Sequence, residues 1–215
     1  MSNITVIGGN GYTGAAVVAE AISRGHVVTV ISRSQPDAPL AGVRYLTGSA
    51  LDGSVLDAGF ELADAVVMAV ANRTGSGQIA QQLAELLAER AAATGVPIFV
   101  VGGFSSLRPA PGEPRVAEGD IPEQYRDEAL AGHASLEVLL GSAAAVDWVF
   151  FSPAAHYGSW VEGSATGNYR LGGEIMMLDE ATGTSHLYAE DLALAILDVI
   201  ESGDRHREHV SVVTV

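Results

Sequence analysis

The stretch VIGGNGYTGAAVVAE, residues 6–20, decides the fold class, because all of its glycines fall within its first nine residues. Gly8, Gly11 and Gly14 follow the spacing Gly-x-x-Gly-x-x-Gly, between an apolar segment and an alanine-rich segment. Glycine allows a tight turn, and its lack of a side chain lets a helix and a phosphate group approach the backbone closely. The stretch therefore predicts the strand, turn and helix that open a dinucleotide-binding βαβ unit.

The amides at the start of the predicted helix would face the phosphate groups, because a helix N-terminus carries free N–H donors and a partial positive charge. The alternative is an ordinary cluster of turn glycines in a chain that has 25 glycines. A second apolar strand arrives within about thirty residues, as a βαβ unit requires, and this order favours the phosphate loop. The predicted contact residues are Gly8, Asn10, Gly11, Tyr12, Thr13 and Gly14.

The segment VISRS, residues 30–34, ends the second predicted strand. An acidic residue at this place binds the ribose 2′-hydroxyl of NAD, whereas an arginine accommodates the 2′-phosphate of NADP. Arg33 offers a guanidinium between the hydroxyl groups of Ser32 and Ser34. The sequence therefore favours NADP, with a solvated loop arginine as the alternative.

Short β-branched segments alternate with longer alanine- and leucine-rich segments along the whole chain, which is typical of a parallel sheet built from βαβ units. We expect one α/β domain over residues 1–215, a Rossmann-type doubly wound parallel sheet with small substrate-side loops. The predicted strands cover 3–7, 26–31, 43–46, 65–70, 97–101, 146–151 and 209–214, and the predicted helices cover 11–24, 76–94, 123–141 and 189–201. Irregular segments at 107–122 and 153–187 are expected to border the substrate pocket.

Composition excludes several functional classes. The formal net charge of −15 opposes binding to nucleic acid or to an anionic membrane. Cysteine is absent, which is compatible with a cytoplasmic location, and all 11 basic residues are arginine. No lysine can therefore take part in catalysis. The segment DRHREH, residues 204–209, is expected to be a solvated turn rather than a metal site, and we expect no metal.

Three segments carry a resemblance to a known family: VIGGNGYTGAAVVAEAISRGHVVTVISRS (6–34), HASLEVLLGSAAAVDWVFFSPAAHYG (133–158), and TGNYRLGG (166–173) followed by SHLYAEDLALAILDVIE (185–201). Together they resemble the atypical short-chain dehydrogenase/reductases of the NmrA-like, NAD(P)-binding type. The chain is also similar to the flavin reductase and biliverdin-IXβ reductase group. The resemblance implies a sheet of seven or eight strands with NADP across its carboxyl edge.

The resemblance also implies positions for the rest of the cofactor. Ala50 and Leu51 would flank the adenine, although Ser49 stands where the family often has an aspartate. Ala69, Val70 and Ala71 would lie beside the ribose and nicotinamide. Backbone groups of Pro153, Ala154 and Ala155 would bind the carboxamide.

The Tyr-x-x-x-Lys pair of typical short-chain dehydrogenases cannot exist here, because the chain has no lysine. The resemblance places the family's tyrosine and lysine positions on Ala129 and His133. In the flavin reductase group the protein mainly positions cofactor and acceptor, and a serine follows the fifth strand. Ser105 and Ser106 stand there, and they either orient the acceptor or bond the local backbone. His133 and His156 are candidate proton donors of the pocket or packed side chains.

These observations predict an NADP(H)-dependent oxidoreductase that reduces a small planar acceptor of the flavin or quinone type. A non-catalytic NADP-binding redox sensor of the NmrA type is the alternative. The missing tyrosine-lysine pair argues against a nucleotide-sugar epimerase. We expect a monomer or a homodimer.

Overall fold

A computed structural model of the chain describes residues 1–70, 77–179 and 182–215. Its main sheet has eight strands in the order β3-β2-β1-β4-β5-β6-β10-β8, and all neighbours pair in parallel except β10 and β8. These strands are β1 (Asn3–Ile7), β2 (Val27–Ser32), β3 (Arg44–Thr47), β4 (Ala65–Met68), β5 (Ile98–Val101), β6 (Trp148–Pro153), β8 (Tyr169–Leu171) and β10 (Glu208–Thr214).

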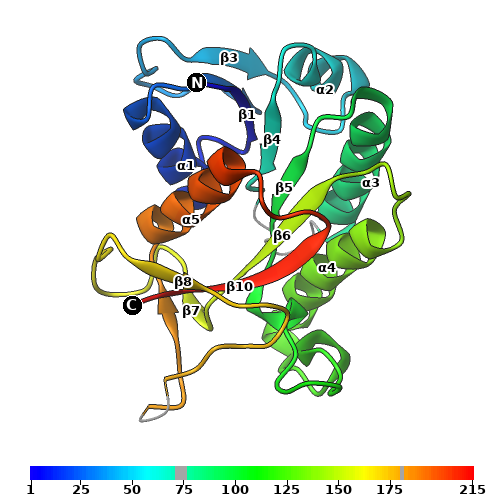
Figure 1. The fold of residues 1–215 in the computed structure, drawn as a ribbon, viewed down its shortest axis with the longest axis vertical. Helices are drawn as coiled ribbons and strands as arrows, with labels where there is room; N and C mark the ends of the chain where they lie inside the picture. Colours follow the sequence, from blue (N-terminus) through cyan, green and yellow to red (C-terminus); the bar gives the residue numbers. More distant parts are fainter. Residues whose placement is uncertain (71–76, 180–181) are drawn as a thin grey trace.

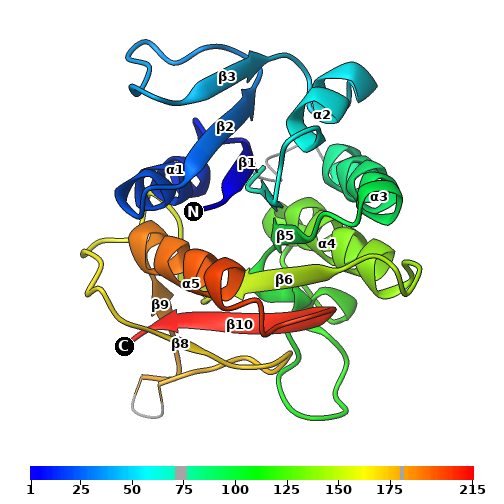
Figure 2. The same cartoon turned by 45° about the horizontal axis from the view of Figure 1, so that its top comes forward.

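Helices cover both faces of this sheet, as Figures 1 and 2 show. They are α1 (Tyr12–Ser23), α2 (Gly53–Phe60), α3 (Gly77–Thr94), α4 (Glu123–Leu140) and α5 (Ala189–Ser202). One apolar core lies between the sheet and α1 and α5, and the other lies between the sheet and α2, α3 and α4. The predicted Rossmann-type doubly wound sheet is therefore confirmed.

Strand β6 illustrates why the chain folds this way. Trp148 and Phe150 enter the core beneath α3 and α4, while Phe151 enters the core beneath α1 and α5. Each of the three side chains is at most 2% exposed. A strand that buries both faces must be apolar throughout, which explains the unbroken apolar segment.

The structure adds elements that the sequence analysis missed. Helix α2 begins after Asp52, whose carboxylate accepts a hydrogen bond from the Ser54 amide. Residues 153–187 hold a second, two-stranded sheet of β7 (His156–Tyr157) and β9 (His186–Leu187), and also strand β8. Two 3₁₀ turns, η1 (Phe104–Ser106) and η2 (Val116–Glu118), lie after β5. These pieces are short, and tertiary contacts rather than periodicity define them.

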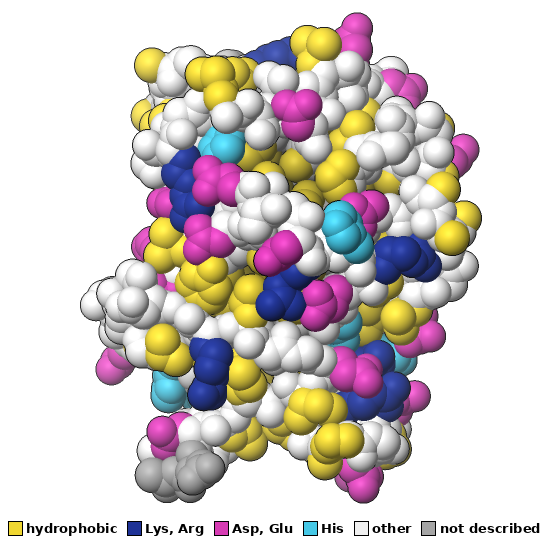
Figure 3. Space-filling view, in the orientation of Figure 1, with side chains coloured by type: hydrophobic (Ala, Val, Ile, Leu, Met, Phe, Trp, Pro, Cys, Tyr) yellow, Lys and Arg dark blue, Asp and Glu magenta, His cyan; other side chains and the backbone are white. Residues whose placement is uncertain are grey.

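None of the helices within the described ranges combines the length and apolarity needed to cross a bilayer. In Figure 3 acidic side chains are scattered over the visible face, with arginines between them rather than gathered in a patch.

Candidate functional site

The loop between β1 and α1 can only be built from glycine at two of its motif positions. Gly8 has φ +84°, and a Cβ atom there would lie 2.6 Å from the Ala69 carbonyl oxygen. A Cβ atom on Gly14 would overlap the carbonyl oxygen of Gly8. The first turn of α1 therefore packs directly on the loop, and the loop packs on the end of β4.

This packing leaves amide donors at the start of α1. Gly11 is the N-cap of the helix, and its own amide donates to the Gly8 carbonyl at 2.9 Å. The following amides, those of Tyr12, Thr13 and Gly14, belong to the first turn, which has no intrahelical acceptors for them. Such a helix start can bind an anionic phosphate group.

The end of β2 is connected to this loop by Asn10. Its side-chain amide donates to the Ser32 hydroxyl at 3.1 Å and to the Ser34 carbonyl at 2.9 Å. Ser32 in turn donates to the same carbonyl at 2.8 Å. Arg33 lies exposed in this turn, and it forms no hydrogen bond or ion pair with any residue that the structure describes. The turn is thus held in shape while its guanidinium stays available.

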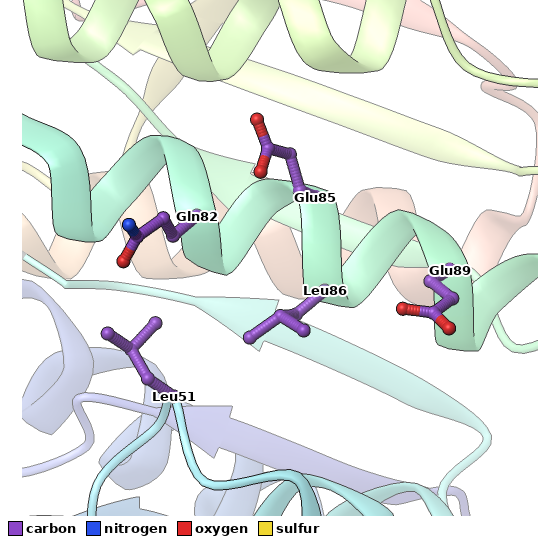
Figure 4. Close-up of a pocket in the computed structure, with 5 residues that line it drawn as sticks. All are labelled: Leu51, Gln82, Glu85, Leu86 and Glu89. Atoms are coloured by element: carbon purple, nitrogen blue, oxygen red, sulfur yellow. The ribbon is translucent and has the colours of Figure 1, made fainter.

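Ala50 and Leu51, the positions implied for adenine, lie half-buried after β3. Leu51 lines a hollow of about 370 Å³ with four residues of α3, and its side chain points toward Leu86 and Gln82 in Figure 4. Ala69 and Val70 follow β4, beside Gly8. Ala71 lies outside the described residues.

The segment after β6 is fixed by Ser185, the residue that precedes β9. Pro153 ends β6 and Ala154 is buried. The Ala155 amide donates to the Ser185 hydroxyl at 3.1 Å, and the His156 amide donates to the Ser185 carbonyl at 2.9 Å. These bonds hold the predicted carboxamide segment at the carboxyl edge of the sheet.

Tyr157 joins this segment to the phosphate loop. Its hydroxyl shares a hydrogen bond with the Thr13 hydroxyl at 2.5 Å, and its ring lies 5.6 Å from that of Tyr12. Burial raises the pKa of Tyr157 well above its ordinary value, so the phenol stays protonated at neutral pH. Tyr157 therefore holds the first turn of α1 and cannot act as a base.

His156 lies on the opposite side of β7 from Tyr157. Its ring stacks on His186 with centroids 4.8 Å apart, and the Trp160 ring meets it edge-on at 6.0 Å. His186 and Trp160 are exposed, so this end of the small sheet presents an aromatic surface to solvent.

The other candidate catalytic residues lie in η1 and in α4, which contact each other. The Ser105 hydroxyl donates to the Ala129 carbonyl at 3.4 Å, while the Ser106 hydroxyl is buried without a partner among the described residues. On α4, the His133 Nδ1 atom is likewise buried and unpartnered, and Nε2 lies 3.9 Å from a Glu137 carboxylate oxygen. Ser105 thus meets the helix at the family's tyrosine position, one turn before His133.

Next to these residues lies a buried polar group whose partners the sequence did not reveal. His209 lies in β10, in agreement with the strand predicted for 209–214, and it is 8% exposed, so it is not part of the solvated turn expected for residues 204–209. Its Nδ1 atom lies 3.2 Å from Arg115 Nη1, and its Nε2 atom lies 2.9 Å from the Ser152 hydroxyl. The available signal was the alternation of HVSVV, which places His209 and Ser211 on one face of a strand.

Burial, reinforced by the Arg115 charge, lowers the pKa of His209 to about 3. Across the described ranges, no group of three or more His, Cys, Asp or Glu side chains is arranged to hold a metal ion.

Comparisons with known proteins agree with this geometry. The chain is 30% identical to a Streptococcus pneumoniae protein named a "putative NADH-flavin reductase", with full coverage of both chains and a TM-score of 0.88. It is 32% identical to a "putative exported protein" from Burkholderia pseudomallei, over 99% of this chain and all of the other, with a TM-score of 0.85. A "putative epimerase" from Bacteroides thetaiotaomicron is 29% identical, over 100% and 97% of the two chains, with a TM-score of 0.84.

The family model for NAD(P)H-binding proteins matches residues 8–202, from the first motif glycine to the last residue of α5. The matched range contains the glycine loop, the Asn10-bound turn and the segment after β6. The chain therefore belongs to the NAD(P)H-binding family, within the atypical short-chain dehydrogenase/reductases.

Proposed function

We propose that the protein is an NADP(H)-dependent oxidoreductase that transfers a hydride to a small planar acceptor of the flavin or quinone type. The observation that carries the cofactor choice is the exposed Arg33, which pairs with none of the described side chains and lies in a turn that Asn10 holds beside the glycine loop. The solved relative from Streptococcus pneumoniae is named for NADH and flavin. Its name supports the acceptor class, whereas Arg33 supports NADPH for this chain.

The described residues fit such a cofactor. A Cβ atom at Gly8 or Gly14 would overlap the neighbouring backbone. Glycine at both positions therefore leaves the backbone of the β1–α1 loop without side chains, as close approach of a diphosphate requires. The amides of Tyr12, Thr13 and Gly14 would bind the diphosphate. Arg33 with Ser34 would bind the 2′-phosphate, whereas the Ser32 hydroxyl, whose proton goes to the Ser34 carbonyl, shapes the turn. The segment from Pro153 to Ala155 would hold the carboxamide, which fixes the face of the ring that meets the acceptor. When bound, the nicotinamide supplies the hydride.

The protein residues then have to orient the acceptor and exclude water. Ser105 already uses its proton in a bond to the Ala129 carbonyl, so it is suited to accept a hydrogen bond from an acceptor group. His156 is half-buried beside the predicted carboxamide segment, and its imidazole is a candidate proton donor to the acceptor. Hydride transfer leaves the acceptor one proton short, and that proton comes from His156 or from solvent.

We further propose a cytoplasmic location, which the absence of cysteine supports.

Turnover and binding together test this proposal. Purified protein is mixed with NADPH or NADH and a panel of flavins and quinones, and the loss of reduced-nicotinamide absorbance is followed. Tight dinucleotide binding by calorimetry with turnover of at least one acceptor is expected. Absence of heat with either cofactor, oxidised or reduced, would remove the basis of the proposal.

A redox sensor of the NmrA type is the second candidate. It is favoured by the residues at the family's tyrosine and lysine positions, Ala129 and His133, of which the first has no proton to transfer. Tight NADP binding without turnover of any acceptor would support the sensor over the enzyme.

A further inference from the structure

A continuous chain of buried hydrogen bonds connects the two segments that border the predicted acceptor site, residues 104–106 and 153–155. Arg115 is 4% exposed, although arginine is seldom buried. Its Nη1 atom donates to the Ser106 carbonyl at 2.8 Å and lies 3.2 Å from His209 Nδ1, and its Nη2 atom donates to Glu174 at 2.8 Å. One side chain thus contacts the turn after β5, strand β10 and the segment that follows β8.

The protonation of this chain follows from donor chemistry. A guanidinium has only donors, so the His209 Nδ1 atom must accept from it and carries no proton. The neutral ring then bears its single proton on Nε2, and this atom donates to the Ser152 hydroxyl at 2.9 Å. Ser152 is the residue before Pro153 at the end of β6. The donor and the acceptor of each hydrogen bond from Arg115 to Ser152 are therefore defined.

The packing around the chain makes these bonds sensitive to geometry. The His209 ring lies edge-on to Phe150 at 5.3 Å, and Gly102 lies so close to the Phe150 ring that a Cβ atom would overlap it. A shift of the turn after β5 would thus have to move Phe150 or break the Arg115 bond to Ser106.

We propose that Arg115 is a positioning residue, which sets the separation of residues 104–106 and 153–155 by bonding the first segment directly and the second through His209 and Ser152. This inference rests on the proposed function, because the acceptor and the nicotinamide would lie between these two segments. Glu174 neutralises the arginine from the solvent side, where it also binds Arg108 at 3.1 Å.

The structure offers a matched control for Arg115. Arg108 lies in the same segment and shares the Glu174 carboxylate, but its other side-chain bond goes to the Glu113 carbonyl rather than to Ser106 or His209. Arg115→Met removes the positioning contacts, whereas Arg108→Met removes the shared ion pair and the bond to the Glu113 carbonyl but no contact with Ser106 or His209. His209→Leu breaks the chain from its other end, whereas His209→Gln can keep both an acceptor for Arg115 and a donor for Ser152.

Three measurements test the proposal. In the wild-type protein, nitrogen NMR of His209 should show a protonated Nε2 and a bare Nδ1. In Arg115→Met and His209→Leu, amide exchange at Ser106 and Leu107 should rise at least about tenfold, the lower factor expected when one buried charged hydrogen bond is lost, with α5 changing less than about twofold. The KM for the acceptor should rise by a similar factor and the Kd for NADPH by less, because the diphosphate and 2′-phosphate contacts are kept, and Arg108→Met and His209→Gln should stay close to wild type.

The outcomes separate this inference from the proposed function. If wild-type protein reduces no acceptor, the proposed function fails, while the exchange and NMR measurements still decide whether Arg115 positions the two segments. The reverse His209 tautomer, or equal exchange at Ser106 in Arg115→Met and Arg108→Met, overturns the positioning role. A fall in melting temperature with unchanged exchange and acceptor KM would also overturn it, because Arg115 would then be structural only. If Arg115→Met does not fold, the comparison of His209→Leu with His209→Gln gives the same decision.

Discussion

At the scale of single residues, the proposed cofactor site depends on Arg33 and the motif glycines. Arg33 is exposed in a turn whose shape is fixed by Asn10, so a change of its side chain alters charge without altering the turn. Gly11 and Gly14 differ in a way that the motif alone does not reveal. A Cβ atom on Gly11 meets only the Gly8 carbonyl, at 3.2 Å, whereas one on Gly14 overlaps that carbonyl.

Arg33→Asp should weaken NADPH binding by at least about tenfold, because a carboxylate would repel the 2′-phosphate that the guanidinium attracts. NADH binding should change little. Calorimetry with both cofactors measures the two effects. Arg44→Asp, at an exposed position at the start of β3, makes the same change of charge away from the turn and should leave the ratio unchanged. Equal losses for NADPH and NADH would contradict the 2′-phosphate site.

Gly11→Val should abolish dinucleotide binding and preserve the fold, because its φ of −82° suits any residue and the added atoms project from the helix cap. Gly14→Ala should lower the melting temperature as well, because α1 must move away from the loop. Circular dichroism and calorimetry on both variants separate the two effects. Retained affinity in Gly11→Val would remove the loop from the site.

At the scale of elements, the small sheet of β7 and β9 braces the start of α1. The Tyr157–Thr13 bond connects a segment at the carboxyl edge to the first turn of the helix that would hold the diphosphate. Loss of this bond should therefore affect both stability and cofactor affinity.

Tyr157→Phe should cost roughly 1 kcal/mol of unfolding free energy and weaken NADPH binding several-fold, because the first turn of α1 loses a side-chain partner. Denaturant unfolding and calorimetry measure these changes. Tyr169→Phe is the matched control, because it removes a phenol bond to Asp198 on α5, with an oxygen-oxygen distance of 2.5 Å, outside the predicted site. An equal change in NADPH affinity in both variants would mean that Tyr157 has no particular connection with the loop.

At the scale of the whole molecule, two buried or partly buried charge clusters make stability depend on pH. Arg24 at the end of α1 binds Glu20, Asp198 and Glu201, and so joins α1 to α5. On the other side of the sheet, His209 faces Arg115, Arg108, Glu174 and His133. Both clusters destabilise the protein in acid, in different pH windows.

The His209 window comes first as pH falls. Its pKa is about 3 in the folded protein against an ordinary 6.5, so below pH 6.5 the unfolded chain binds a proton that the folded chain does not. With respect to His209, the free energy of unfolding is therefore highest above pH 6.5. It falls toward pH 3, and the loss is about 2–3 kcal/mol at pH 4.5. Denaturant unfolding of wild type and His209→Gln between pH 7 and 4.5 measures this loss. The free energy of unfolding of the variant should depend little on pH in this range. If it falls in parallel with that of the wild type, His209 is not the titrating group.

The Arg24 cluster acts at lower pH. Burial opposes the ionisation of Asp198, but hydrogen bonds from Tyr169 and Arg24 outweigh it and hold the pKa of Asp198 below its usual value. Burial likewise opposes the ionisation of Glu201, and bonds from Arg24 and His26 outweigh it and keep its pKa low. Their stabilisation is present above the ordinary carboxyl pKa and is lost as pH falls through the folded values. Arg24→Met should lower the melting temperature at pH 7 and flatten its fall below pH 4.5, and a steeper fall would contradict this assignment.

Much of the fold could be predicted because local patterns and global architecture agree. The strands and the long helices α1, α3, α4 and α5 follow apolar periodicity, and their predicted bounds differ from the structure by a few residues at most. Strands β7, β8 and β9 were missed because two or three residues are too few to show alternation, and helix α2 was missed because its eight residues span little more than two turns. For the site, the glycine motif identified the loop, but nothing local could show that Asn10 holds the Arg33 turn from 22 and 24 residues away.

The sequence by itself determined the doubly wound architecture and the place of the glycine loop between β1 and α1, because glycine spacing and apolar periodicity are local properties of the chain. It also excluded lysine and cysteine chemistry by composition. Only the tertiary structure decided that Tyr157 reaches Thr13 and that Arg115, His209 and Ser152 form one buried chain. The physical reason is that burial and hydrogen-bond direction depend on residues brought together from distant segments. The sequence around a histidine therefore does not show whether the folded sheet buries it.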